Sequence, residues 1–464
     1  MSEIRFGTDG WRDIIADGYT MANLARAAQA YADYLVETGG KRAVVGYDTR
    51  FLSDRFARRA AEVLAASGLE TFLSHDYLPT PAASFAVTYL GADGGIMITA
   101  SHNPPVYNGF KLKGSYGGSA TPEIVTGVEK KLASARPRPY DPAAKIQEFD
   151  IRKDYYQALT RLLDLNLLSN TPRTLYHETM GGAGAGWLTG FAKFSGLPIT
   201  VHELHGVPSP TFYGVNPEPI PQNLKTAMAV LGPESAPVFA AVTDGDADRI
   251  GAVLAGGKYF DSHAIFLVLM DHLLKKGGSG RVVKTFPGSR MIDLLAQKRG
   301  VECLTLPVGF KYVTDEFLKG GVLIGGEESG GIGVAGHIPE RDGILNGLLL
   351  LEATARAGAG LDEIFAQLES EVGYPHAYDR LDLHLPDLDA KERALVQVRE
   401  PQPLAGLKPV AVDPLDGIKW IYDDGSWLLF RASGTEPLLR IYCESHSPAQ
   451  VKELLSAARK LVGM

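Results

Sequence analysis

A unit made of a strand, a loop and a helix recurs three times along the chain, starting near residues 44, 175 and 282. In each copy a short apolar run leads into a polar or glycine-rich loop, a helical segment follows, and a glycine ends the helix. Copies this far apart are typical of related domains, because the units of a solenoid repeat roughly every 20–50 residues. The recurrence therefore predicts three related α/β domains.

The first copy shows how the unit is read from the sequence. A helix is expected over 23–38, a strand over 42–47, and Ser53 is expected to cap the helix that ends at Gly68. The proline-rich stretch at 136–142 is typical of a domain boundary.

The last part of the chain departs from this pattern. A strand at 382–385 precedes a helix-prone segment at 389–399, and Asp423-Asp-Gly-Ser426 is a strong turn signal between two apolar strands. A strand at 440–443 then leads to Ser447, which is expected to cap the final helix. The predicted fold class is α/β, with three related α/β domains plus a C-terminal α+β domain arranged around a central cleft. The expected domains are 1–145, 146–254, 255–372 and 373–464.

Composition narrows the class of protein. With 45% apolar and 22% charged residues among 464, the chain is typical of a soluble globular protein. The net charge of −8 argues against a nucleic-acid or membrane partner. Cys303 and Cys443 have no metal-ligand spacing and cannot form a disulfide framework. Because no apolar run approaches the roughly 18 residues of a membrane span, and no signal-peptide pattern is seen, a cytoplasmic location is expected.

The stretch Thr99-Ala-Ser-His-Asn-Pro-Pro-Val-Tyr-Asn-Gly-Phe-Lys111 follows an apolar run that is typical of a buried strand. Ser101 is therefore expected where a strand ends, a usual place for working side chains in α/β proteins. Two prolines stiffen the loop, and an Asn-Gly pair turns the chain so that Lys111 can face Ser101. A serine next to His102 on such a loop indicates a modifiable hydroxyl; a turn serine that caps a backbone group is the alternative.

Thr243-Asp-Gly-Asp-Ala-Asp-Arg249 lies between two apolar runs that predict strands. Its carboxylates, Asp244, Asp246 and Asp248, can converge on one point, where they would repel each other unless a cation lies between them. All-oxygen ligands favour Mg²⁺, and the loop lacks the glycine and glutamate positions of an EF-hand. A solvated acidic turn is the alternative.

Gly325-Gly-Glu-Glu-Ser-Gly-Gly331 follows a predicted strand at 322–324. Glu327 and Ser329 can point the same way, and a carboxylate with a hydroxyl suits recognition of sugar hydroxyls, although an ordinary turn is equally open. The segment 331–336 fits G-x-G-x-x-G, but a His-Ile-Pro sequence follows where a helix should begin. Dinucleotide binding is therefore rejected.

Arg431-Ala-Ser-Gly-Thr-Glu-Pro437 follows a predicted strand at 427–430. An arginine, two hydroxyls and a glycine that lets backbone N–H groups turn inward favour a phosphate site, with a hydroxyl-rich turn as the alternative. Together the four stretches indicate phosphoryl transfer to or from a polyhydroxylated ligand in a central cleft. The sequence has no P-loop, zinc-protease or esterase motif that would favour other chemistry.

The four stretches also resemble, in the same order, the four signature loops of the α-D-phosphohexomutases, and the resemblance spans the whole chain. By that resemblance Ser101 is a phosphoserine that gives and regains a phosphoryl group. The resemblance also implies Mg²⁺ held by Asp244, Asp246, Asp248 and the phosphoserine oxygen, and Arg249 close to the phosphate.

The resemblance implies further roles by position. Lys111 is the general acid/base candidate, with His102 beside the serine. The remaining implied residues are Arg12 in the cleft, Glu327, Ser329 and Lys311 for the sugar, and Arg431, Ser433, Gly434 and Thr435 for the phosphate that is not transferred.

The implied reaction passes through a hexose 1,6-bisphosphate, which also acts as activator. Glu-Glu-Ser resembles the phosphoglucomutase branch, and Gly331 stands where mannose- and glucosamine-acting relatives carry histidine; that role is absent or passes to the segment 337–341. The expected reaction is glucose 1-phosphate to glucose 6-phosphate, with mannose phosphates as a side activity. A phosphomannomutase, a phosphoglucosamine mutase, a sugar phosphatase and a non-catalytic sugar-phosphate sensor are the alternatives. The chain is expected to be a monomer or a homodimer.

Overall fold

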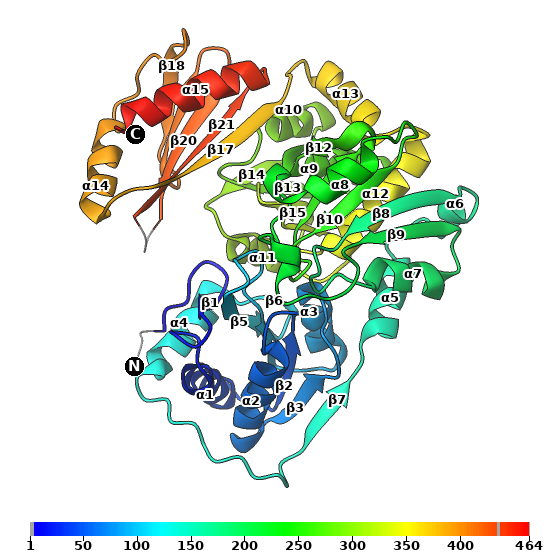
Figure 1. Ribbon diagram of the computed structural model, residues 1–464, viewed down its shortest axis with the longest axis vertical. Helices are drawn as coiled ribbons and strands as arrows, with labels where there is room; N and C mark the ends of the chain where they lie inside the picture. Colours follow the sequence, from blue (N-terminus) through cyan, green and yellow to red (C-terminus); the bar gives the residue numbers. More distant parts are fainter. Residues whose placement is uncertain (1–3, 434–436, 464) are drawn as a thin grey trace. The chain divides into compact units, whose positions relative to one another are not determined.

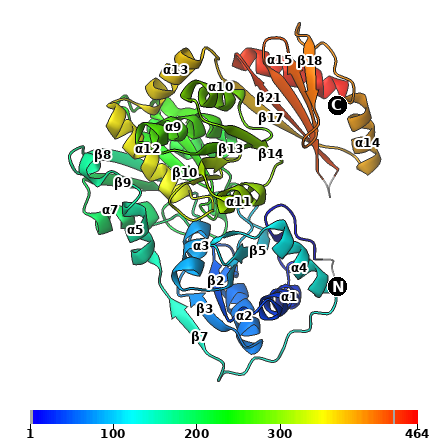
Figure 2. The ribbon, with the colours of Figure 1, turned by 180° about the vertical axis from the view of Figure 1, so that it is seen from behind.

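A computed structural model describes residues 4–433 and 437–463 of the chain. It divides into two compact units, which we describe separately: residues 1–283 with 309–364, and residues 284–308 with 365–464. Figure 1 and Figure 2 show the elements of both units from opposite sides. No helix in the described ranges has the length and apolar character needed to cross a membrane.

The N-terminal sheet of the first unit has the strand order β1-β5-β4-β2-β3-β7, with β6 paired to β5. Strands β2, β3 and β4 are parallel, whereas β5 returns antiparallel to β4. Alanine-rich faces of the helices and the apolar side chains of the sheet form the core. The strands are β1 (Trp11–Ile14), β2 (Arg42–Tyr47), β3 (Glu70–Ser74), β4 (Gly94–Ile98), β5 (Tyr107–Gly114), β6 (Gly118–Ser119) and β7 (Ile146–Phe149), and the helices are α1 (Met21–Glu37), α2 (Ser53–Ala66), α3 (Thr80–Tyr89) and α4 (Pro122–Leu132).

The prediction that Ser53 caps its helix is wrong. Leu52, with a left-handed φ of 59°, holds the N-cap position of α2, and Ser53 is the first helical residue. The Ser53 hydroxyl instead donates a hydrogen bond of 2.8 Å to Asp48 Oδ1. The hydroxyl that was expected to bond to a backbone N–H group of the helix thus bonds to the buried carboxylate of Asp48 instead.

The next sheet of the first unit has the order β12-β11-β10-β8-β9. Strand β10 is parallel to β8, and it pairs antiparallel with β11 in a hairpin, so that the acidic loop 244–249 forms the tip of that hairpin. The strands are β8 (Arg173–Glu178), β9 (Ile199–Leu204), β10 (Phe239–Thr243), β11 (Ile250–Leu254) and β12 (Lys258–Phe260), and the helices are α5 (Arg152–Thr160), α6 (Leu165–Ser169), α7 (Trp187–Ser195) and α8 (Lys225–Leu231).

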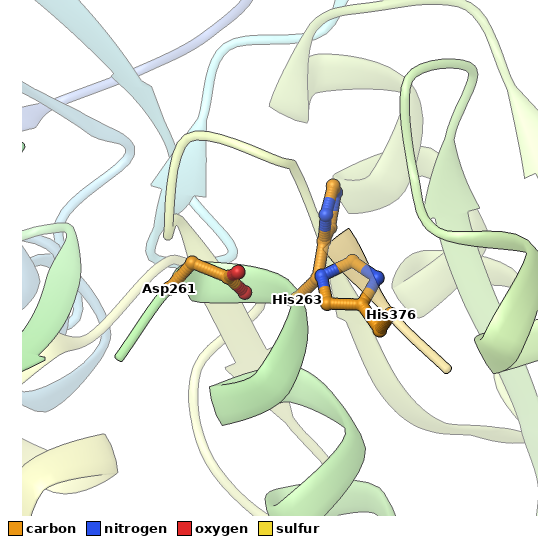
Figure 3. Close-up of side chains that lie close together, drawn as sticks. All are labelled: Asp261, His263 and His376. Atoms are coloured by element: carbon orange, nitrogen blue, oxygen red, sulfur yellow. The ribbon is translucent and has the colours of Figure 1, made fainter. Parts of the chain in front are cut away.

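The rest of the first unit supplies the loop at residues 327–331, which we call the glutamate loop. Strand β15 (Val322–Gly326) pairs antiparallel with β16 (Ile332–Val334), which rules out the strand–helix arrangement of a dinucleotide fingerprint and confirms its rejection. The helices are α9 (Ser262–Lys275), α11 (Phe310–Lys319) and α12 (Gly343–Ala357). Figure 3 shows Asp261 and His263 at the start of α9, where the Asp261 side chain accepts the N-cap hydrogen bond from Ala264 N.

The second unit contains an antiparallel sheet of order β17-β21-β20-β19-β18. The predicted hairpin is confirmed by the pairing of β19 with β20, and Ser447 caps the last helix by accepting from Gln450 N at 3.2 Å. The elements are α10 (Arg290–Arg299), β14 (Cys303–Leu306), β17 (Ala377–His384), α14 (Leu388–Gln397), β18 (Pro409–Asp413), β19 (Ile418–Tyr422), β20 (Trp427–Ala432), β21 (Leu438–Ser445) and α15 (Pro448–Leu461). Strand β13 (Arg281–Thr285) and helix α13 (Leu361–Val372) each run from the first unit into the second.

Candidate active site

The loop that carries Ser101, residues 99–106, lies between the end of β4 and the start of β5, and we call it the serine loop. Ser101 thus follows the end of a strand, as predicted. Lys111 is on β5, directly across from Met97 of β4. Ser101 is 1% exposed and has a left-handed φ of 51°, a conformation that costs free energy outside glycine. Its hydroxyl donates a hydrogen bond of 2.8 Å to Asp244 Oδ2. The loop therefore holds the serine oxygen against the first residue of the acidic loop.

Arg50 fixes the backbone of the serine loop. Its Nη2 donates to the carbonyl oxygens of Ser101 at 2.7 Å and Asn103 at 2.6 Å. Its Nη1 donates to those of Pro104 and Tyr107, each at 2.9 Å. Four charge-assisted hydrogen bonds from one buried guanidinium restrain the loop more than the prolines could alone. The sequence analysis missed this residue, because nothing in the local pattern links it to the loop.

Gly245 lets the serine loop approach the acidic loop closely. A Cβ at this position would lie only 2.4 Å from the carbonyl oxygen of Ser101, which is closer than real Cβ atoms come to another heavy atom. A glycine between the first two aspartates is therefore a steric requirement of the contact between the two loops.

Lys111 lies among three carboxylates. Its Nζ is 2.8 Å from Asp246 Oδ2, 2.7 Å from Asp248 Oδ2 and 2.8 Å from Asp9 Oδ2. Burial alone would lower the pKa of Lys111, but the three carboxylates outweigh burial and raise it above its usual range. Lys111 is therefore a cation at neutral pH, held by charge against the aspartates of the acidic loop that Ser101 also contacts.

The three aspartates converge as predicted: one carboxylate oxygen of each lies within 4.8 Å of the others. Burial and the charges of Asp246 and Asp248 raise the pKa of Asp244. Burial would also raise the pKa of Asp246, yet Lys111 outweighs that effect and lowers it. The Oδ1 atoms of Asp246 and Asp248 are buried and accept no hydrogen bond within the described part of the chain. Buried carboxylate oxygens without a donor are the ligands that a hard divalent cation such as Mg²⁺ prefers, so this donor set fits the metal.

Backbone hydrogen bonds join the acidic loop to the glutamate loop. Arg249 pairs with Gly331 in an antiparallel bridge, and Ile250 N donates to the carbonyl oxygen of Gly330 at 2.9 Å. The two loops are thus joined by backbone hydrogen bonds, which hold the loop that carries Glu327 next to the acidic loop.

Arg341 connects these parts electrostatically, and the sequence analysis did not single it out. Its Nη2 lies 2.6 Å from Asp9 Oδ2 and 2.8 Å from Asp248 Oδ2, and its Nη1 lies 3.4 Å from Glu327 Oε2. The side chain also passes over the Gly331 backbone: a Cβ on that glycine would lie 2.3 Å from Arg341 Cδ. Arg341 therefore fills the space that a histidine side chain at position 331 would need.

Four more of the residues implied by the resemblance lie in the first unit: His102, Arg12, Glu327 and Lys311. His102 Nδ1 is 3.5 Å from the Ser101 oxygen, and Arg12 Nη1 donates to Asn103 Oδ1 at 2.7 Å. Burial raises the pKa of Glu327 to about 7, although Arg341 opposes the shift. The ammonium group of Lys311 lies 5.4 Å from the centroid of the neighbouring Tyr312 ring.

Two further residues implied by the resemblance, Arg249 and Ser329, lie in the acidic loop and in the glutamate loop. Arg249 N donates to Asp244 Oδ1 at 3.1 Å, and its Nε is buried without a hydrogen-bond acceptor in the described ranges. Ser329 is partly exposed at the tip of the glutamate loop.

The fourth stretch belongs to the second unit. Arg431 Nε donates to Asp416 Oδ2 at 3.1 Å, and Lys391 Nζ donates to the carbonyl oxygen of Ser433 at 2.9 Å. Gly434 and Thr435 lie outside the described residues. The phosphate-binding role of this stretch stays a prediction.

Comparison with known proteins assigns the chain to a family along most of its length. The models of the phosphoglucomutase/phosphomannomutase family match α/β/α domain I at residues 3–138, domain II at 153–257, domain III at 261–372 and the C-terminal domain at 395–461.

Individual relatives agree with the family models. The chain is 31% identical to a phosphoglucomutase/phosphomannomutase of Thermococcus kodakarensis over 463 residues, which is 98% of each chain. It is 32% identical to a Thermococcus gammatolerans protein provisionally assigned as phosphoglucosamine mutase, again over 98% of each chain. A crystal structure of a Thermus thermophilus protein, provisionally assigned as phosphomannomutase, superposes with a TM-score of 0.91 at 48% identity over 100% of both chains. The chain therefore belongs to the phosphoglucomutase/phosphomannomutase family and is a phosphohexomutase.

Proposed function

We propose that this phosphohexomutase interconverts glucose 1-phosphate and glucose 6-phosphate through phosphoserine 101 and a hexose 1,6-bisphosphate, with mannose phosphates as a second substrate. The observation that carries the proposal is the contact of the Ser101 hydroxyl with Asp244, at the edge of a carboxylate cluster that fits a divalent cation. A serine oxygen held beside such a cluster suits the transfer of a phosphoryl group, because the surrounding charges can stabilise it in transit.

In the proposed first transfer, the P–O bond to Ser101 breaks while a P–O bond to the oxygen of the free sugar hydroxyl forms, and the proton of that hydroxyl ends on the Ser101 oxygen. After the bisphosphate has reoriented, the Ser101 hydroxyl loses this proton and its oxygen takes the other phosphoryl group, while the bond to the sugar oxygen breaks and that oxygen gains a proton. Lys111 serves as general acid/base, and as a cation at neutral pH it is equipped to protonate the departing sugar oxygen. Mg²⁺ bound to Asp244, Asp246 and Asp248 would offset negative charge on the transferring group.

The other residues bind and orient the sugar phosphate. Arg12 and Arg249 carry positive charge beside the serine loop, and His102 flanks the serine oxygen. Glu327 and Ser329 are proposed to accept and donate hydrogen bonds to sugar hydroxyls. Lys311 is proposed to bind the sugar with them, and the residues proposed to hold the phosphate that is not transferred are Arg431, Ser433, Gly434 and Thr435.

The preference for glucose rests on position 331. Relatives that act on mannose or glucosamine phosphates are expected to carry histidine here, whereas this chain has Gly331 with Arg341 across it. The curated relatives are named for glucose, mannose and glucosamine phosphates, so a phosphomannomutase or a phosphoglucosamine mutase is the second candidate.

A substrate panel separates these candidates. We expect turnover of glucose 1-phosphate with Mg²⁺, lower turnover of mannose 1-phosphate and little of glucosamine 1-phosphate, measured as formation of each 6-phosphate. Comparable turnover of glucosamine 1-phosphate with none of glucose 1-phosphate would contradict the proposal. Net release of inorganic phosphate in the same assay would identify a phosphatase instead.

Removal of the metal gives a direct test of the carboxylate cluster. Dialysis against EDTA is expected to lower mutase turnover by at least about 10²-fold, because the transferring group loses its main charge compensation. Added Mg²⁺ should restore the rate. Unchanged turnover after complete chelation, checked by metal analysis, would refute a metal-dependent reaction.

Gly331→Ala tests whether Arg341 must lie against the residue 331 backbone. The new Cβ would lie 2.3 Å from Arg341 Cδ, so the arginine must shift away from the carboxylates that it contacts. We expect kcat/KM for glucose 1-phosphate to fall about 10–100-fold, since small displacements in a catalytic site have effects of this size. Gly232→Ala is the matched control: its nearest atom would be 3.2 Å away, on an exposed helix end, and its kinetics should equal those of the wild type.

A further inference from the structure

A cavity of about 300 Å³ lies within the second unit, and none of the residues assigned to the reaction lines it. This volume is at the lower end of the range for pockets that bind small molecules. Its lining includes the apolar side chains of Phe286 and Leu294 and three cations against two carboxylates. The cations are Lys284, Arg290 and Lys419, and the carboxylates are Asp293 and Asp413.

Lys419 is the least compensated of these cations. It is 8% exposed, and its Nζ donates one hydrogen bond, to the carbonyl oxygen of Phe286 at 3.0 Å. The ammonium group also lies 3.9 Å from the centroid of the Trp427 ring. No carboxylate lies within ion-pair distance of it in the described part of the chain. Two of its three N–H donors are therefore available, although the side chain is buried.

The neighbouring lysine shows the contrast. Lys284 Nζ lies 2.5 Å from Asp293 Oδ2 and donates to the carbonyl oxygens of Gly288 and Ser289. Lys284 is thus ion-paired and its donors are used. Burial lowers the pKa of Lys419 to about 7 and the nearby charge of Lys284 adds to this shift, while the charges of Glu444, Asp293 and Asp413 oppose it without reversing it.

Arg290 supplies a second cation without an ion-pair partner among the described residues. Its backbone N–H donates to Glu444 Oε2 at 2.8 Å, and its guanidinium lies against Gly425, where a Cβ would be 3.1 Å from Arg290 Cζ. Glu444 also accepts from Trp427 Nε1 at 2.6 Å and from the Ser289 hydroxyl. These contacts fix the wall in place before any ligand arrives, which lowers the entropic cost of binding.

We propose that this cavity is a second ligand site, which binds a small organic anion. Its phosphate monoester or carboxylate group would pair with Lys419 and Arg290, and its apolar body would pack against Phe286, Leu294 and Ile421. The reason is electrostatic: a buried ammonium without a counter-charge is costly, and an anion that accepts its free N–H groups removes that cost. A neutral ligand of the same shape gains only the apolar contacts.

Chemical labelling of the wild-type protein tests the site directly. Pyridoxal 5′-phosphate carries an anionic group and an aldehyde; the neutral amine of Lys419 adds to the aldehyde, water leaves, and borohydride reduces the imine to a stable amine. Peptide mapping at pH 7.5 is expected to show Lys419 labelled at least about tenfold faster than the exposed Lys452, because the lowered pKa of Lys419 leaves much of its amine unprotonated and the anionic group of the reagent is bound beside it. Excess phenyl phosphate should protect Lys419 and leave Lys452 unaffected. Labelling of Lys419 no faster than Lys452, or without protection, overturns the proposal.

Calorimetry identifies the preferred anion. Phenyl phosphate and benzoate are titrated into the wild type, Lys419→Met and the matched surface variant Lys452→Met, with benzyl alcohol as the neutral probe. We expect at least one of the two anions to bind at a site that is weakened tenfold or more in Lys419→Met and unchanged in Lys452→Met, and no comparable binding of the alcohol. Identical isotherms for the wild type and Lys419→Met would place all binding elsewhere and refute the site. Mutase turnover of Lys419→Met shows that the variant is folded.

Discussion

Ser101→Ala is expected to lower mutase turnover by at least about 10³-fold, because the serine oxygen is the proposed carrier of the phosphoryl group. The hydroxyl contacts the side chains of Asp244 at 2.8 Å and His102 at 3.5 Å, so its loss removes side-chain contacts and leaves the backbone of the loop in place. Alanine meets the same left-handed φ of 51° as serine, and Arg50 still binds the loop carbonyls. The effect should therefore be on catalysis and not on folding.

The measurement compares steady-state mutase rates, intact protein mass and circular dichroism. The wild type incubated with a hexose 1,6-bisphosphate is expected to gain the mass of one phosphoryl group, and Ser101→Ala is expected to gain none. The exposed Ser115→Ala is the matched control and should retain both turnover and phosphorylation. Full activity of Ser101→Ala would refute the carrier role, whatever its phosphorylation state.

Patterns that are local in sequence predicted the centre of the site. The position of Ser101 just after a strand follows from the apolar run before it, and it is confirmed by the end of β4 at Ile98. The predicted Asn-Gly turn is wrong: Asn108 and Gly109 lie within β5, and the chain turns back over residues 101–106 instead. The convergence of Asp244, Asp246 and Asp248 follows from their spacing in a single hairpin loop, and it is also confirmed. In both confirmed cases the residues concerned lie within a few positions of one another, so local geometry determines the outcome.

Contacts between distant segments could not be predicted in this way. Arg341 and Asp9 are separated by 332 positions, and Arg50 binds a loop more than fifty positions away. Neither arginine has a distinctive local pattern. The partners of Arg50 come from the loop after a neighbouring strand of the same sheet, and those of Arg341 come from segments far apart in the chain. Buried charges of this kind become recognisable only when the carboxylates around them are known. The signals that the sequence offered, Arg12 three positions after Asp9 and the segment 337–341, indicated the neighbourhood and not the contact.

Arg341→Met is expected to lower the free energy of unfolding by about 3–5 kcal/mol, the usual cost of removing one partner from a buried ion-pair network. Arg341 is 2% exposed and contacts Asp9, Asp248 and Glu327. Methionine fills much of the same volume but leaves these carboxylates without their cation, so the change tests charge more than packing. Urea denaturation followed by circular dichroism measures the loss.

The matched control is Arg356→Met. Arg356 also pairs with a carboxylate, Asp164 Oδ2 at 2.7 Å, but its side chain is 35% exposed. Solvent screening limits the contribution of such a pair to about 1 kcal/mol or less, so the control should unfold close to the wild type. Equal unfolding free energies for Arg341→Met and Arg356→Met would contradict the interpretation that Arg341 neutralises the carboxylates around Lys111.

Stabilisation of Arg341→Met by Mg²⁺ tests whether Arg341 acts by neutralising the carboxylates or only by packing in the fold. With Arg341 absent, Asp248 retains its ion pair with Lys111, and Asp9 retains Lys111 and a longer pair with Arg12 at 3.6 Å. Added Mg²⁺ should then stabilise the variant against urea more than it stabilises the wild type, because a bound cation replaces part of the missing charge. If Mg²⁺ stabilises both proteins equally, Arg341 and the metal act on separate groups, and the carboxylates do not form the single electrostatic network that their distances indicate.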